Sequence, residues 1–119
     1  MRSHQNLTVM MMIRKFGETV PHRKRVKTVI DASAGEYEYN YEDQEPKRGQ
    51  FNEIMPYDEL MTRFGVKSEA DYLGTFLPDT DVAEGDLLYV HGYWMEILNL
   101  YRHRTSGTID YLEGLMRKQ

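Results

Sequence analysis

The sequence predicts a mainly β protein, a small antiparallel β-barrel with a long loop and one short helix inserted. Three observations predict this class: several short segments alternate apolar and polar residues, glycine and proline turns separate those segments, and helical periodicity is confined to one stretch. At 119 residues, the chain has the length of one domain. We therefore expect residues 1–119 to form a single barrel, with the loop and the helix inserted at about 33–71.

The N-terminal part predicts two strands. Residues 6–15 alternate in the manner of a strand. One face of that strand would hold Leu7, Val9, Met11 and Ile13. Residues 17–22 would then interrupt the pattern, because Pro21 stops a strand from continuing. Residues 26–32 predict the second strand. In residues 33–52 tyrosines alternate with polar residues, and we expect either a long extended loop or an exposed hairpin there.

The rest of the chain predicts the helix and a meander of strands. The helix is expected at 56–64, where Pro56 suits the first turn and Gly65 can end the last one. Strands are expected at residues 72–77, 86–90, 93–102 and 108–116. The strand at 93–102 is apolar on both faces, so neither face can simply meet water. We expect one face to fill the barrel, and the helix and neighbouring subunits to cover the other.

Composition narrows the classes of function. A formal net charge of -4 argues against wrapping nucleic acid through broad phosphate neutralisation. No cysteine is present, so disulfides and thiolate chemistry are excluded. The first residues lack the apolar run of a signal peptide, and the longest apolar stretch, residues 9–13, is too short to span a membrane. We expect a soluble protein with no membrane partner.

Catalytic and metal-binding patterns are also missing from the sequence. The four histidines, His4, His22, His91 and His103, do not have the spacing of metal ligands. The serines lack the context of a nucleophile elbow, and the glycines do not form a phosphate-binding pattern. The sequence therefore predicts no catalytic, cofactor or metal site, and a protein that is not an enzyme.

Two charged segments are the candidate sites. The first is an acidic and aromatic run made of Glu36, Tyr37, Glu38, Tyr39, Tyr41, Glu42 and Asp43. The second is a basic run made of Arg23, Lys24, Arg25 and Lys27. Either run can be a solvated surface that merely aids solubility, as charged runs often are. As functional sites, the acidic run would line a channel, and the basic run would dock on an acidic protein surface or contact DNA.

The C-terminal half carries a resemblance. Residues 74–78 (GTFLP), 81–86 (DVAEGD) and 90–97 (VHGYWMEI) give a strand, a turn, an EGD entry, a strand, a turn with glycine and an aromatic-led return strand. This order of elements, together with the chain length, resembles the small head-closure or head–tail joining proteins of tailed bacteriophages and related viruses. That family acts structurally, so the resemblance implies no catalytic residue.

The resemblance implies a subunit of the virion neck, present in the host cytoplasm during assembly. Its partners would be copies of itself in a ring, commonly a dodecamer, the adaptor or portal protein, and tail terminator or tail proteins. Residues 33–52 would project into the channel and help to retain packaged DNA, which would be present only as channel contents. Two alternatives stay open: another neck or tail component such as a tail terminator, and a small barrel that binds single-stranded nucleic acid. The second alternative would need a basic groove with exposed aromatic residues.

Overall fold

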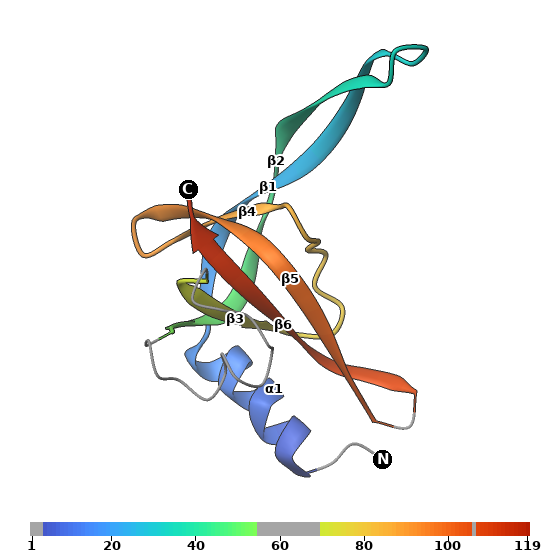
Figure 1. The fold of residues 1–119 in the computed structure, drawn as a ribbon. Coiled ribbons are helices and arrows are strands. Elements are labelled where there is room, and N and C mark those ends of the chain that lie inside the picture. Colours follow the sequence, from blue (N-terminus) through green and yellow to red (C-terminus); the bar gives the residue numbers. More distant parts are fainter. Residues whose placement is uncertain (1–3, 55–69, 106) are drawn as a thin grey trace.

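The computed structural model describes residues 4–54, 70–105 and 107–119. Within these residues the chain forms α1 (His4–Phe16), β1 (Glu18–Asp31), β2 (Glu36–Glu53), β3 (Tyr72–Phe76), β4 (Leu87–Val90), β5 (Tyr93–Thr105) and β6 (Thr108–Lys118). The strands close into an antiparallel barrel in the order β1-β2-β3-β6-β5-β4 (Figure 1). The predicted fold class is confirmed. The helix predicted at 56–64 lies outside the described residues.

The barrel interior is packed around the ring of Phe76, which is fully buried. Its neighbours in the core are Val20, Phe51, Val82, Leu88, Val90, Met95, Ile97, Leu100, Leu112 and Met116. Two glycines give the ring its space. A Cβ atom on Gly49 would lie 2.8 Å from Cδ1 of Phe76, and one on Gly74 would lie 2.9 Å from its Cζ. Because interiors are close-packed, these two positions accept no larger side chain without movement of the ring.

A bulge in β5 explains why this strand is apolar on both faces. Ile97 pairs with Met116 and Asn99 pairs with Leu115, so Leu98 is the extra residue. The bulge shifts which residues point inward, and Leu100 is buried in the barrel although Leu98 is not. Leu98 instead packs on a second, smaller cluster of Ala70, Leu73 and Leu115. Both faces of β5 thus find apolar partners within this one chain.

The strand predicted at residues 6–15 is wrong, because this segment is the helix α1. Met10 and Ile13, three residues apart, form its buried side, and Ile13 is fully buried. Methionine is a good helix former, and Arg14 and Lys15 suit the negative end of the helix dipole. A short apolar run fits either period, so alternation alone misassigned it. The helix packs against β2 and β6.

The interruption predicted at residues 17–22 is also wrong, because β1 runs through it. Pro21 lies at a shift in register: Val20 pairs with Lys47, whereas His22 pairs with Gln44. A residue without an N–H group is tolerated at such a bulge, since it need not donate to the ladder. The second predicted strand, at 26–32, is confirmed as the far part of β1.

Beyond the barrel wall, β1 and β2 continue together as a two-stranded hairpin. β1 pairs with β4 only at His22 and Arg23, and β2 pairs with β3 only from Gly49 to Glu53. We call residues 24–42 the arm. Figure 1 shows the arm projecting from the barrel on the side away from α1, which makes the molecule 51 Å long but only 32 Å and 28 Å across. Of the two forms expected for residues 33–52, the structure has the hairpin.

Candidate functional site

The arm has two chemically different faces, set by the register of its strands. Directly opposite residues lie on the same face of a sheet, and successive residues alternate between faces. Tyr41 lies opposite Arg25, and Tyr39 lies opposite Lys27. The same face continues to Tyr37, two residues before Tyr39, and to Arg23 at the base of the arm. We call it the cation–tyrosine face, made of Arg23, Arg25, Lys27, Tyr37, Tyr39 and Tyr41.

The cations of this face lie over the aromatic rings. Cζ of Arg25 is 4.3 Å from the ring centre of Tyr39, and Nζ of Lys27 is 4.1 Å from that of Tyr37. The rings of Tyr37 and Tyr39 meet edge to face at 5.4 Å. Despite these contacts, the tyrosines of the face remain 41–49% exposed. Each cation–π contact at such an exposed site contributes about 0.5–1 kcal/mol.

The acids of the arm lie mainly on its other face, which we call the acidic face. Glu42 lies opposite Lys24, and Glu38 lies opposite Thr28. Asn40, between them, donates a hydrogen bond from Nδ2 to Oγ1 of Thr28 at 3.2 Å. The alternation of Tyr and Glu along β2 therefore separates rings from carboxylates, rather than mixing them on one surface.

At its base, the cation–tyrosine face continues onto the barrel wall. Arg23 Nε donates to Oδ1 of Asp43 at 2.9 Å, and its Cζ lies 4.1 Å from the ring centre of Trp94. Trp94 in turn contacts Tyr89, with ring centres 5.3 Å apart, and Tyr89 is exposed. The arm and the barrel together present an aromatic surface with interleaved cations.

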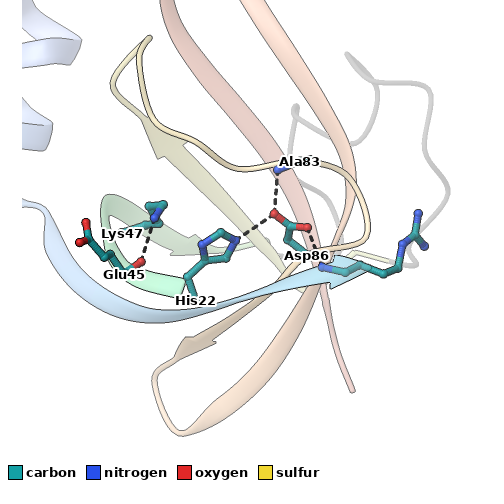
Figure 2. A network of polar contacts seen from close by, with 6 residues as sticks. His22, Glu45, Lys47, Ala83 and Asp86 are labelled. Carbon is teal, nitrogen blue, oxygen red and sulfur yellow. Dashed lines mark hydrogen bonds and ion pairs between the residues drawn. The ribbon is translucent and has the colours of Figure 1, made fainter. Parts of the chain in front are cut away.

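A buried pair, His22 and Asp86, lies where the arm joins the barrel (Figure 2). Nε2 of His22 donates to Oδ2 of Asp86 at 2.9 Å, because a carboxylate can only accept. Backbone N–H groups also reach this carboxylate: that of Ala83 donates to Oδ2 and that of Arg25 donates to Oδ1, each at 3.1 Å. The pair connects the first residues of the arm to the turn at residues 83–86.

The carboxyl group of Asp86 is held in its charged form. Burial alone would raise its pKa, but the hydrogen bond from His22, those from the backbone of Arg25 and Ala83, and the charge of His22 together lower the pKa below the ordinary value of 3.8. The charged carboxylate is thus a fixed acceptor for three donors, and it holds the backbone of β1 in place.

Gly85 leaves the space that the side chain of Arg25 occupies. Its φ angle is +92°, and a Cβ atom there would lie 2.3 Å from Cζ of Arg25. The guanidinium group therefore lies between the bare backbone of the glycine and the face of the Tyr39 ring. Any other residue at position 85 would strain the backbone, and its Cβ would force the end of the Arg25 side chain to move.

The two candidate sites of the sequence are one structural unit. The acidic and aromatic run is on β2, the basic run is on β1, and the two runs pair across the hairpin. Lys24 alone among the four basic residues lies on the acidic face. Sequence reasoning missed the partnership of His22 with Asp86. The glycine and acid of the EGD turn were the available signal for it.

The described part of the chain has neither a cluster of metal-ligating side chains nor a helix that could cross a membrane. Its residues contain no group of three or more metal-ligating side chains. The one helix in these ranges, α1, is not long and apolar enough to cross a membrane. No protein-family model, curated protein or solved structure matches this chain.

Proposed function

We propose that this chain is a structural virion protein of the head-closure type, a subunit of a ring in the neck of a tailed virus. The ring joins the portal or adaptor protein to the tail, and the arm of each subunit reaches into the channel and helps to retain packaged DNA. The observation that carries the proposal is the arm, a long hairpin that leaves a closed barrel.

An arm of this kind suits a surrounding assembly. A two-stranded hairpin is marginally stable in water by itself, and its outer edges carry unpaired backbone groups. Near the tip, Val29 and Ile30 are 60% and 59% exposed. Apolar side chains at the end of a projecting hairpin are typical of a surface that other chains cover.

A second exposed apolar surface lies at the other end of the molecule. On α1, Met11 and Phe16 are 65% and 67% exposed, and Figure 1 shows this helix on the far side of the barrel from the arm. Two different patches on one subunit suit heterologous contacts between copies, which close into a ring when the rotation permits. This arrangement supports a ring of identical subunits, such as the dodecamer that the resemblance implies.

The experiment uses the purified full chain, alone and mixed with portal complex, studied by native mass spectrometry and negative-stain imaging. We expect rings, or a ring added to the portal. Monomers that never join a portal complex would overturn the proposal.

A variant without the arm tests the arm's part in DNA retention. Val26 and Asn40 are direct partners in the hairpin, so residues 27–39 can be replaced by Asn-Gly, a sequence that forms two-residue turns. We expect heads carrying this variant to assemble but to leak DNA. A matched variant, Lys24→Gln, keeps the arm at full length and should retain DNA. Equal retention by heads with and without the arm would remove its proposed role.

A further inference from the structure

We infer that the cation–tyrosine face is a binding surface for single-stranded nucleic acid, with phosphates held by Arg23, Arg25 and Lys27 and bases stacked on the tyrosines. This goes beyond the proposed function, in which DNA is only the content of a channel. It does not depend on ring formation, because the surface is complete within one chain.

The separation of charges is the first argument. In the sequence, the tyrosines stand between acids, which disfavours contact with phosphate. In the structure, Glu38 and Glu42 point to the acidic face, and the tyrosines share their face with the cations. Among the described residues at the base, Asp43 is the carboxylate that pairs with Arg23, and its side chain is 85% exposed. Such an exposed pair contributes about 0–1 kcal/mol, so a phosphate can replace the carboxylate at small cost.

The aromatic rings favour nucleic acid over an acidic protein. Tyr37, Tyr39 and Tyr41 recur at every second residue of a strand, which spaces them at about 7 Å. Platforms for single strands combine such rings with a cationic track for the backbone, and stacking contributes about 1–3 kcal/mol per base. An acidic peptide would use the cations but would gain much less from three successive rings.

The contacts that Lys27 and Arg25 make within the arm are weak enough to be replaced by contacts with a phosphate. Lys27 lies over Tyr37 in a contact worth about 0.5–1 kcal/mol. Moving its ammonium group to a phosphate frees the ring for a base. The guanidinium group of Arg25 already lies between the backbone of Gly85 and the ring of Tyr39, so it loses less freedom on binding an anion than a fully solvated side chain would.

The acidic face limits the affinity. Its carboxylates are separated from the cation–tyrosine face only by the thickness of one two-stranded ribbon. Charges within the Debye length, about 8 Å at physiological salt, are not fully screened, so these carboxylates repel a bound phosphate. Binding should therefore be weak and strongly salt-sensitive. Three phosphate contacts on a single strand predict a slope of about −2 in a plot of log K against log salt concentration.

The test measures fluorescence anisotropy of a labelled oligothymidylate with the full chain over a range of salt concentrations. The variant Arg23→Gln/Lys27→Gln should bind more weakly and should reduce the magnitude of the salt slope by about 1.4, since two phosphate contacts are lost. Lys24→Gln is the matched control, because it removes a cation of the same strand from the acidic face. Equal loss in both variants, or no salt-sensitive binding by the native chain, would overturn the inference.

Two further measurements identify the ligand. Tyr37→Leu/Tyr39→Leu keeps apolar side chains in the hairpin, and it should weaken binding of the single strand much more than binding of a duplex. Polyglutamate at equal charge should compete poorly with the oligothymidylate. Competition as strong as that of unlabelled oligothymidylate would show a site for acidic protein instead. Circular dichroism of each variant verifies the fold, and native mass spectrometry of the same samples reports ring formation separately.

Discussion

Nε2 of His22 lies 2.9 Å from Oδ2 of Asp86, and both side chains are almost completely buried. The two residues are 64 positions apart in the chain, yet they meet at the point where β1 leaves the barrel. Because the same carboxylate accepts the backbone N–H of Arg25, the pair fixes the direction in which the arm starts. We therefore expect both the stability of the barrel and the direction of the arm to depend on this buried pair.

Replacing Asp86 with Asn should lower the free energy of unfolding by about 3 kcal/mol, because it breaks a buried pair that also receives two backbone donors. Urea unfolding followed by circular dichroism measures this. Asp43→Asn, at the exposed pair with Arg23, is the control and should cost less than about 1 kcal/mol. Similar small losses in both variants would contradict a stabilising role for the buried pair.

Stability should also depend on pH through Asp86. Its pKa is lowered in the folded protein, since the hydrogen bonds and the charge of His22 outweigh the effect of burial. The resulting stabilisation is present above the unfolded-state pKa, which is near 3.8, and is lost as the pH falls through the folded-state pKa. The free energy of unfolding, measured from about pH 7 to pH 2, should fall more steeply below about pH 4 in the native chain than in Asp86→Asn.

The comparison of the native chain with Asp86→Asn isolates the contribution of the Asp86 carboxyl group. Asp31 also has a lowered pKa, through hydrogen bonds from Ser33 and Ala34, but it is the same in both chains and cancels in the difference. Parallel profiles for the native chain and Asp86→Asn at low pH would contradict the assignment.

A further prediction concerns the ring of Phe76. Gly49→Ala should destabilise the barrel by about 1–3 kcal/mol, because the new Cβ would lie 2.8 Å from the ring. Gly114→Ala is the control, since its Cβ would lie 3.5 Å from the same ring, at ordinary contact distance. Chemical denaturation measures both. Adding Phe76→Leu to Gly49→Ala should cost less than the sum of the single changes, and strict additivity would contradict a steric cause.

The arm should be dispensable for folding. Replacing residues 27–39 with Asn-Gly removes exposed side chains and shortens a hairpin that lies outside the core. We expect the free energy of unfolding to change by less than about 1 kcal/mol, as for other surface changes. Thermal and urea unfolding measure it. Loss of cooperative unfolding would show that the barrel needs the arm.

Alternation with a period of two predicted most of the barrel. The strands at 72–77, 86–90, 93–102 and 108–116 appear with small changes of boundary. The turn with glycine expected within residues 90–97 is a tight hairpin turn, in which His91 and Gly92 both have positive φ angles, 50° and 91°. These strands could be predicted from the local sequence because each is short and is bounded by turn residues.

The errors arose where local pattern was ambiguous. The run of three methionines at residues 10–12 fits a strand or a helix, and the core contacts of Ile13 decide for the helix. Pro21 was expected to end a strand, but β1 continues through it because the proline lies at a bulge. Bulges depend on the partner strand, so a single sequence does not reveal them.

Residues of the candidate sites could be identified from sequence, but their partnership could not. Arg25 and Tyr41 are neighbours only because of the register of the hairpin, and this register shifts twice along its length. Until the register is known, a basic run and an acidic run look like two separate surfaces. The structure shows that both runs belong to one two-stranded ribbon, which has a cation–tyrosine face and an acidic face.

The two faces of the arm restrict how its length can change. Unless a bulge absorbs it, a single residue removed from or added to β2 near the base of the arm would turn the side chains beyond that point to the opposite face, and glutamates would then lie beside Arg25 and Lys27. A matched change of two residues in each strand would preserve both surfaces and alter only the reach of the hairpin. Forms of this arm that change in length between its base and the tyrosines should therefore differ from it by even numbers of residues per strand.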